Sequence, residues 1–385
     1  MRPKLILLFA VLFIPSCNLF YPEFFTETVI ERRGNTEVRD RYAGWEFVPD
    51  RWITEGAVNY VKIFIDKSSG TPYIAYRDDT NNFRLAVMRY NGEEWKYVKR
   101  RSVTESRVGE LNLFVENGVV YVAFQDAFND NRAKVIKYSG GEWTTIGDSH
   151  ISEREARSIS LFVHNEKPYI AYADRDKLRD LTVKVFDAGN WQDISPPSVS
   201  PIGGVASVSL YVDNSVPYIG LQDIYNLGAA SVLKHAGGND WDFLQEQGFT
   251  QGTALSTRLI VYKGTPYLAF SDGANTSRLT VMKFDGTFWR YVGNAGFSKD
   301  TVTEINLAAE NDKLYVAFQD SANFARASVM QYQENEGWKY VGGEGFTAGS
   351  VVSLSFSIHS GVPYIAFRDN SKDGKNRLTV MRKPK

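Results

Sequence analysis

Short segments in which hydrophobic and polar residues alternate recur along the chain from about residue 44 to its end. The segment Val-Ser-Leu-Tyr-Val-Asp at residues 208–213 is one example, and its period of two is that of a half-buried β-strand. Turn-forming pairs such as Asn91-Gly92 and Asp285-Gly286 separate the segments. The pattern therefore predicts an all-β chain of short strands joined by tight turns.

One apolar strand that ends in aspartate occurs seven times at nearly constant spacing. It reads Tyr-Ile-Ala-Tyr-Arg-Asp at residues 73–78 and Tyr-Val-Ala-Phe-Gln-Asp at residues 121–126. The seven aspartates, 48 or 49 residues apart, are Asp78, Asp126, Asp174, Asp223, Asp272, Asp320 and Asp369. Each repeat contains four strand-like segments and no helical segment, which is typical of a β-propeller. We predict seven blades of four strands each.

The tryptophans predict how the ring closes. Six of them follow a repeat aspartate by 17 or 18 residues: Trp95, Trp143, Trp191, Trp241, Trp289 and Trp338. No tryptophan follows Asp369, but Gly44-Trp45-Glu-Phe-Val near the start of the chain matches Gly337-Trp338-Lys-Tyr-Val. We therefore expect the N-terminal strand to complete the last blade, so that no sheet edge stays open at the closure. The predicted propeller spans residues 44–385 as one domain.

This architecture resembles the broad class of seven-bladed propellers that includes WD-repeat, kelch and bacterial secreted propellers. The resemblance covers nearly all of the predicted mature chain. The signature pairs of WD repeats do not recur from repeat to repeat, because Gly-His is absent and Trp-Asp occurs once, at Trp241-Asp242. Because such folds host many functions, the resemblance implies the architecture and no particular activity.

The first residues have the layout of a secretory signal. Arg2 and Lys4 precede an apolar run at residues 5–14 that is too short to span a bilayer. The following Ile14-Pro15-Ser16-Cys17 resembles the lipobox of bacterial lipoproteins, which implies cleavage before Cys17 and lipid on its thiol. We predict a signal peptide at residues 1–16, a lipidated Cys17 with a tether at residues 17–43, and an exported bacterial membrane lipoprotein on the periplasmic face or the cell surface.

Charge and composition narrow the classes of partner. The formal net charge is −1, so we predict no nucleic-acid partner. Cys17 is the single cysteine, so the propeller has no disulfide framework. The chain has four histidines and lacks a nucleophile elbow, a phosphate-binding glycine loop and a His-Glu-x-x-His motif. We accordingly assign no catalytic residue, no metal ligand and no cofactor.

Residues repeated in every blade are expected to serve the fold. The repeat aspartates, followed six residues later by arginine in four copies, are interpreted as hydrogen-bonding and salt-bridging groups at the hairpin ends. The repeated tryptophans, and Phe249, Phe297 and Phe346 of the Gly-Phe-Ser/Thr segments, are interpreted as packing between blades. Function is expected where the seven copies differ.

The loops between the second and third strands differ most between blades. Four of their aromatic side chains are predicted to form a partner or glycan surface on a polar rim: Phe83, Phe128, Tyr225 and Phe324. The alternative is that these side chains fold down onto neighbouring blades.

The innermost strands have one mixed face, which we expect to line the central channel. Its positions nearest the loops are Lys62, Asn112, Ser160, Ser209, Arg258, Asn306 and Ser355. The ends of the second strands add Arg77, Gln125, Gln222, Gln319 and Arg368 to the predicted channel mouth. Hydrogen-bond donors dominate this set, which suits a sugar, a carboxylate or a peptide terminus. A water-filled structural channel is the alternative.

Polar residues also mark the other end of the innermost strands. They are Glu116, His164, Asp213, Tyr262, Glu310 and His359. Carboxylates and imidazoles could hold a divalent cation, but residues before tight turns are commonly polar for solvation alone. We therefore predict no metal here.

Three functions fit the sequence. The first is a non-enzymatic binding or scaffold lipoprotein of the bacterial envelope that presents its loop face to an envelope protein, an extracellular protein or a polar ligand. The second is a carbohydrate-active enzyme, either a glycosidase or a lyase, that uses the central pocket. The third is a lectin that binds glycans. Two carboxylates converging on one pocket would favour the enzyme.

Overall fold

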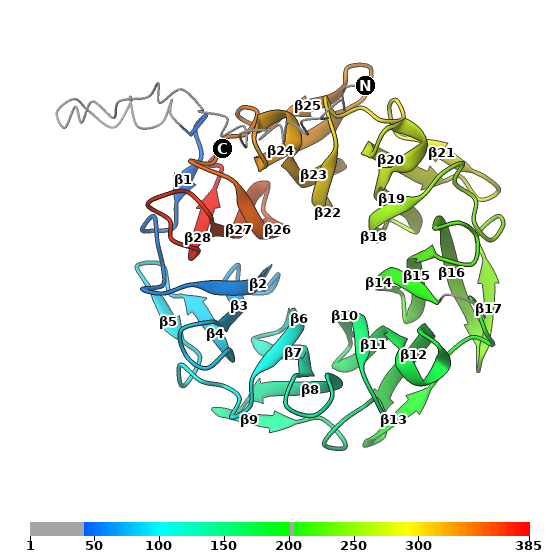
Figure 1. The fold of residues 1–385 in the computed structure, drawn as a ribbon, viewed down its shortest axis with the longest axis horizontal. Helices are drawn as coiled ribbons and strands as arrows, with labels where there is room; N and C mark the ends of the chain where they lie inside the picture. The colour runs from blue at the N-terminus through cyan, green and yellow to red at the C-terminus, as the bar shows by residue number, and fades with distance from the viewer. Residues whose placement is uncertain (1–41, 201–203) are drawn as a thin grey trace, which may run out of the picture.

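Seven four-stranded antiparallel sheets stand around a central channel in the computed structural model, which describes residues 42–200 and 204–385. Figure 1 shows the blades as a closed ring with one strand of each blade lining the centre. The predicted all-β, seven-bladed propeller is therefore confirmed.

The strands of each blade run in order from the channel to the outside, so they fall into four concentric sets. The inner strands are β2 (Val58–Ile65), β6 (Val108–Glu116), β10 (Ala156–His164), β14 (Val205–Asp213), β18 (Ala254–Tyr262), β22 (Val302–Glu310) and β26 (Val351–His359). The second strands are β3 (Pro72–Asp78), β7 (Val119–Asp126), β11 (Lys167–Asp174), β15 (Val216–Asp223), β19 (Thr265–Asp272), β23 (Lys313–Asp320) and β27 (Val362–Asp369).

The third strands are β4 (Arg84–Tyr90), β8 (Arg132–Ser139), β12 (Asp180–Asp187), β16 (Ala229–Gly237), β20 (Arg278–Phe284), β24 (Arg326–Gln333) and β28 (Arg377–Arg382). The outer strands are β5 (Trp95–Tyr97), β9 (Glu142–Thr145), β13 (Asn190–Asp193), β17 (Asp240–Phe243), β21 (Trp289–Tyr291), β25 (Gly337–Tyr340) and β1 (Glu46–Phe47). Blade 1 is β2–β5, and the blades are numbered along the chain. Three single turns of 3₁₀ helix lie between second and third strands: η1 (Arg175–Lys177), η2 (Gly273–Asn275) and η3 (Ser321–Asn323).

Blade 7 contains both ends of the propeller. The short strand β1 pairs antiparallel with β28, with Glu46 opposite Arg382 and Phe47 opposite Met381. The prediction that the Trp45 segment completes the last blade is therefore confirmed. Closure removes the exposed strand edges that an open array of blades would leave.

Each seam between blades is closed by a tryptophan that lies in an outer strand or, for Trp45, directly before it. Every indole N–H donates to a backbone carbonyl of the preceding blade, at 2.6–3.1 Å, and the seven donors are Trp45, Trp95, Trp143, Trp191, Trp241, Trp289 and Trp338. At three seams a phenylalanine of the preceding blade stacks on the indole, in the pairs Phe249–Trp289, Phe297–Trp338 and Phe346–Trp45. The packing role predicted for these aromatics is confirmed.

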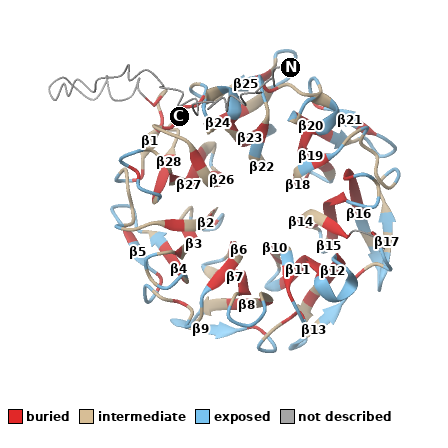
Figure 2. Cartoon of the chain, in the orientation of Figure 1, coloured by how far each residue is buried: buried red, intermediate tan, exposed pale blue. Residues whose placement is uncertain are grey.

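The hydrophobic core is divided among the seams between blades. Seven clusters of buried side chains each join neighbouring blades. Figure 2 shows the buried residues inside the blades and the exposed ones at the periphery. Because apolar burial is non-directional and scales with area, seven similar clusters hold the ring together evenly.

The predicted signal peptide, Cys17 and nearly all of the tether lie outside the described residues. Of the segment predicted to be tether, Tyr42 is buried and its ring meets Phe47 edge-on, so propeller packing begins before residue 44. In the described part of the chain, no helix combines the length and the hydropathy needed to cross a membrane.

Candidate functional site

One face of the propeller holds the starts of the inner strands and the loops between second and third strands. In blade 1, Val58 at the start of β2 lies opposite Asp78 at the end of β3, so both lie at the same end of the sheet. The same register joins Val302 and Asp320 in blade 6. We call this the loop face, and the other side, with the hairpins between first and second strands, the opposite face.

A β-bulge interrupts every inner strand close to the loop face. The register shifts between Asn59 and Lys62 in β2, and at the equivalent place in the other six inner strands. A bulge re-aims side chains by inserting an extra residue. In blade 1, Tyr60 within the bulge and Lys62 just after it both line the same cavity.

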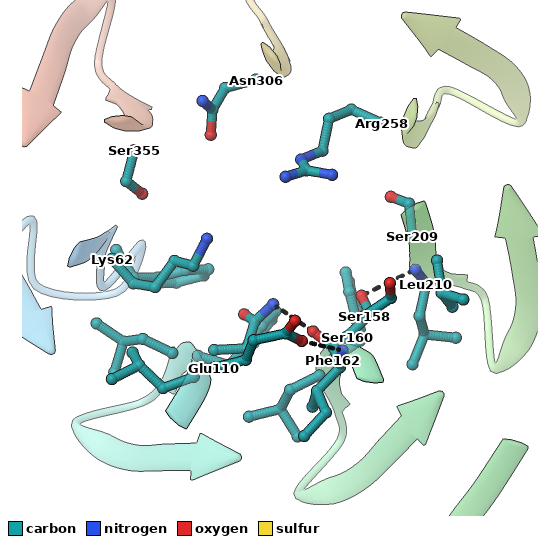
Figure 3. A pocket seen from close by; sticks show the side chains of 18 of the residues that line it. Lys62, Glu110, Ser158, Ser160, Phe162, Ser209, Leu210, Arg258, Asn306 and Ser355 are labelled. Atoms are coloured by element: carbon teal, nitrogen blue, oxygen red, sulfur yellow. Dashed lines mark hydrogen bonds between the residues drawn. The ribbon is translucent and has the colours of Figure 1, made fainter. Parts of the chain in front are cut away.

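This cavity, of about 450 Å³, opens into the channel at the loop face. It gathers all seven predicted inner-strand positions, which we call the mouth ring: Lys62, Asn112, Ser160, Ser209, Arg258, Asn306 and Ser355. Figure 3 shows several of these side chains projecting into the cavity from different blades. Sequence reasoning thus located the channel mouth correctly, while its role in binding stays a prediction.

Five members of the mouth ring connect their blade to the next one. The hydroxyl oxygens of Ser160, Ser209 and Ser355 each accept a backbone N–H of the next inner strand, at 2.9–3.0 Å. The amides of Asn112 and Asn306 donate to backbone carbonyls of the next inner strand, at 3.5 and 3.1 Å. The serine hydroxyl hydrogens and the asparagine carbonyl oxygens stay available to a ligand.

The other two members are cations. Within the described residues, no hydrogen bond or ion pair is made by Lys62 Nζ, and the Arg258 guanidinium donates to the carbonyl of its own neighbour Thr257, at 2.8 Å. Burial and the nearby Arg258 lower the pKa of Lys62 from 10.5 to about 8, while Glu304 and Glu110 act in the opposite direction. Burial also lowers the pKa of Arg258. Figure 3 shows both side chains reaching into the same space.

Two carboxylates near these cations were missed by the sequence analysis. Glu110 lines the cavity and accepts the backbone N–H of Ile159, and Glu304 accepts that of Ser353, both at 3.4 Å. Both residues stand two positions before a mouth-ring residue, at the β-bulge of their strand. Serine occupies the equivalent position in four other blades, so a polar residue two positions before the ring was the available signal.

Aromatic side chains form the floor of the cavity along one half of the channel. Phe64, Phe114, Phe162 and Tyr211 follow one another around blades 1–4, with neighbouring ring centroids 4.5–4.8 Å apart. The first three line the loop-face cavity, and all four line a second cavity on the opposite face. In blades 5–7 the equivalent residues are Ile260, Ala308 and Ser357. The channel wall is therefore asymmetric.

The second-strand part of the predicted channel mouth needs correction. None of the five residues Arg77, Gln125, Gln222, Gln319 and Arg368 lines the cavity. They lie one strand farther from the channel, and four of the five side chains bond to nearby backbone or side-chain groups instead: Arg77, Gln125, Gln319 and Arg368. Gln125 donates to the Ala156 carbonyl of the next blade at 2.6 Å, and Arg368 bonds to Asn370 at 3.0 Å.

The four predicted rim aromatics lie on the loop face with different exposure. Phe128 and Phe324 are 77% and 81% exposed, Tyr225 is 54% exposed, and Phe83, over which Arg77 stacks, is 42% exposed. The alternative that they fold onto neighbouring blades therefore does not describe Phe128 and Phe324. Two further exposed apolar residues, Leu178 and Leu227, were missed because only aromatics were considered. Like Phe324, both stand four residues after the repeat aspartate.

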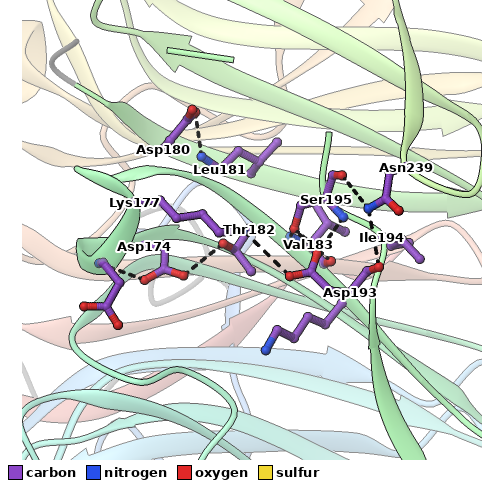
Figure 4. Close-up of polar contacts among 12 residues, drawn as sticks. Asp174, Lys177, Asp180, Leu181, Thr182, Val183, Asp193, Ile194, Ser195 and Asn239 are labelled. Carbon is purple, nitrogen blue, oxygen red and sulfur yellow. Dashed lines mark hydrogen bonds and ion pairs between the residues drawn. The ribbon is translucent and has the colours of Figure 1, made fainter. Parts of the chain in front are cut away.

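The repeat aspartates serve the fold, as expected. In blade 3, Asp174 accepts the backbone N–H of Asp176 at 3.1 Å and the hydroxyl of Thr182 at 3.0 Å (Figure 4). This is the capping geometry that aspartate favours before a helical turn. In blade 1, Asp78 forms a salt bridge with Arg101 at 2.7 Å, which agrees with the salt-bridging role expected of these aspartates.

Two of the polar residues predicted at the opposite end of the inner strands, Glu116 and Glu310, form hydrogen bonds with turns of the next blade. The carboxylates of Glu116 and Glu310 each accept two backbone N–H groups from the first hairpin of the next blade. Among the residues that the structure describes, no group of three or more His, Cys, Asp or Glu side chains could hold a metal ion.

Comparisons with known proteins show no family and only distant structural likeness. No protein-family model matches the chain, and no curated protein matches it either. Among solved structures it is similar to the fucose-specific lectin from Aleuria aurantia, with 13% identity, 76% of this chain and 96% of the lectin covered, and a TM-score of 0.48. It is also similar to YjhT, with 11% identity, 75% and 98% coverage and a TM-score of 0.49. Likeness at this level carries no argument about this chain.

Proposed function

We propose that this protein is an exported, non-enzymatic binding lipoprotein of the bacterial envelope that recognises a saccharide at the mouth of its central channel. The observation that carries the proposal is the composition of the loop-face cavity. Hydroxyl, amide and cationic groups ring its wall, and phenylalanine rings form part of its floor.

This composition matches the two kinds of surface that a sugar presents. Sugar hydroxyls both donate and accept hydrogen bonds, and the mouth ring offers donors at Ser160 and Ser209 and an acceptor at Asn306. The apolar face of a sugar ring can lie against Phe114 or Phe162. The cavity volume of about 450 Å³ falls within the range of about 300–1,000 Å³ usual for small-ligand sites.

The path of the chain gives a lipid anchor at Cys17 a consistent orientation. Strand β28 runs from the loop face, where Arg377 pairs with Asp369, to the opposite face. Because β1 is antiparallel to β28, the chain enters β1 from the opposite face. The described chain therefore enters the propeller on the side away from the cavity, which supports an anchor that leaves the cavity open to a glycan.

The exposed rim supports contact with something larger than one sugar. Phe128, Leu178, Leu227 and Phe324 lie on the face that contains the cavity. Exposed apolar side chains on a polar rim are typical of surfaces that meet a partner. A longer glycan or an envelope protein bound across the loop face would cover them.

Glycoside hydrolysis is the second candidate, and one observation favours it. Glu110 and Glu304 both act electrostatically on Lys62 and Arg258, so two carboxylates lie near one cavity. Paired carboxylates are the usual machinery of glycosidases. Release of reducing ends from a bound glycan, lost in Glu110→Gln, would identify an enzyme, whereas intact glycan after prolonged incubation identifies a binder.

A glycan array tests the proposed function directly. The purified chain should bind a subset of glycans, and free sugar should compete for binding. Asn112→Leu keeps the volume of the side chain but removes its hydrogen bonds, so it should weaken this binding. Lys67→Gln, an exposed change on the opposite face, is the matched control and should bind like the wild type. Failure of the wild type to bind any glycan would overturn the proposal.

A further inference from the structure

The two cations of the mouth ring stand where the other blades make a bond across the seam. Serine or asparagine connects the inner strand to the next blade in blades 2, 3, 4, 6 and 7. Lys62 in blade 1 and Arg258 in blade 5 make no such bond within residues 42–200 and 204–385. In the described part of the chain, the mouth-ring side chain therefore does not connect blade 1 to blade 2 or blade 5 to blade 6.

Keeping these two side chains in the cavity is unfavourable for the protein alone. Each charge is removed from most of its water, and each repels the other. Glu110 and Glu304 compensate in part, but both carboxylates also accept backbone N–H groups of the next blade. An anion bound between the two cations would reduce both the repulsion and the cost of burial.

We infer that the cavity takes a sugar that bears a carboxylate, held between the Lys62 ammonium and the Arg258 guanidinium while the sugar hydroxyls meet the rest of the mouth ring. The inference rests on the proposed function and names its ligand class. One guanidinium nitrogen of Arg258 is held by the Thr257 carbonyl, which leaves the other donors of the planar group for a carboxylate.

The charges around the cavity favour a monoanion over a dianion. Lys62 and Arg258 contribute two positive charges, and Glu110 and Glu304 contribute two negative charges nearby. A carboxylate carries one negative charge and a phosphate monoester nearly two. The attraction to the cations and the repulsion from the glutamates both rise in proportion to this charge, whereas the cost of removing the anion from water rises faster and weighs against the dianion. A uronic acid fits this balance better than a sugar phosphate.

The blades themselves supply substitutions that the fold accepts. Lys62→Ser and Arg258→Ser introduce the residue that Ser160, Ser209 and Ser355 already place at this position in three blades. Each variant removes one cation without adding bulk to the cavity. Thermal unfolding followed by circular dichroism would verify that both variants fold like the wild type.

Isothermal titration calorimetry with matched sugars tests the inference. Galacturonate is compared with galactose, and glucuronate with glucose, because each pair differs mainly in the carboxylate. The wild type should prefer the acid of at least one pair by about tenfold or more, as expected for hydrogen bonds to a charged group. Lys62→Ser and Arg258→Ser should each lose about tenfold for that acid and lose much less for the neutral sugar, so that the preference for the acid falls.

The outcomes separate the inference from the proposed function. Equal binding of acid and neutral sugar, or an acid preference that survives in both serine variants, would overturn the carboxylate assignment and leave saccharide binding intact. Tighter binding of galactose 1-phosphate than of galacturonate would overturn it in favour of a phosphate. Absence of binding to every glycan on the array would defeat the proposed function, and the inference with it.

Discussion

The seams between blades and the wall of the central channel are built from the same seven repeats, yet they differ in kind. At the seams every blade contributes the same contact, an indole N–H on a carbonyl of the preceding blade. At the mouth of the channel equivalent positions hold serine in three blades, asparagine in two, lysine in one and arginine in one. The constant seam contacts therefore stabilise the ring, while the residues of the channel wall can differ from blade to blade.

The contrast extends to the floor of the channel. Four aromatic rings cover blades 1–4, whereas Ile260, Ala308 and Ser357 occupy the same level in blades 5–7. A symmetric channel would offer a ligand seven equivalent orientations. This one offers an aromatic side and a smaller, more open side, so a bound sugar can be held in one orientation.

Removing a seam tryptophan should have the largest effect on stability. Trp45 is buried, donates to the Val341 carbonyl and stacks on Phe346. Trp45→Ala should lower the free energy of unfolding by about 3–5 kcal/mol, as for other large-to-small changes in cores. Urea unfolding followed by tryptophan fluorescence and circular dichroism measures it.

Trp289→Ala is the matched comparison, because Trp289 makes the same contacts with Leu244 and Phe249 at an internal seam. If the closing seam contributes as much stability as the internal seams, the two variants should lose a similar amount of the free energy of unfolding. A Trp45→Ala variant as stable as the wild type would contradict the account of closure through β1.

Removing a repeat aspartate should have a smaller effect. Asp320 is fully buried and accepts hydrogen bonds from Ala322, Asn323 and Ser328. Asp320→Ala leaves these donors unsatisfied and should cost about 1–3 kcal/mol. Thermal and urea unfolding would measure the loss. If Asp320→Ala instead bound sugar more weakly while its free energy of unfolding stayed unchanged, this repeated position would belong to the ligand site.

Lys62 should reduce stability slightly, unlike the seam residues. Burial lowers its pKa in the folded protein from the ordinary value of 10.5 to about 8, with Arg258, Glu110 and Glu304 facing it. Below pH 8 the side chain is charged in both the folded and the unfolded state, and the penalty is complete. Between pH 8 and 10.5 the folded protein releases the proton and the penalty disappears. Its size is on the order of 1 kcal/mol after screening by water in the cavity.

Unfolding of the wild type and Lys62→Ser in parallel, from about pH 7 to about pH 10, isolates this contribution. The stability of the wild type relative to the variant should rise with pH over this range. A difference that stays constant would show that burial does not penalise the charge on Lys62.

The exposed rim should contribute least to stability. Joint substitution of Phe83, Phe128, Tyr225 and Phe324 by serine should change the free energy of unfolding by about 0.5 kcal/mol or less per site, because surface changes are usually small. Monosaccharide binding should be unchanged. A pull-down from detergent-solubilised envelope should lose any protein that docks on the loop face, and an unchanged set of captured proteins would argue against the rim as a protein interface.

Much of the fold could be predicted from the sequence because equivalent residues recur at a nearly constant spacing. The spacing of the aspartates defines seven blades, and the match between Trp45 and Trp338 identifies the closing strand. The mouth ring was also readable, because a period of two assigns Lys62 and Arg258 to the channel side of their strands.

What could not be read from the sequence depends on bulges and on contacts between blades. A period of two places Glu110 and Glu304 on the same side of their strands as Asn112 and Asn306, but the sequence does not show the β-bulge at these positions, so the alternation was not extended past the mouth ring. Gln125 was misplaced because its amide reaches across to the Ala156 carbonyl of the next blade. Pairings between repeats depend on the angle between blades, which the sequence of one repeat does not contain.

The most direct test of the central claim is to locate the bound ligand. Hydrogen–deuterium exchange followed by mass spectrometry, with and without the tightest-binding glycan from the array, reports which backbone amides it protects. The account predicts slower exchange at the loop-face starts of β2 and β18, around Lys62 and Arg258. Protection confined to the outer loops that contain Phe128 and Phe324, or to hairpins of the opposite face, would contradict it.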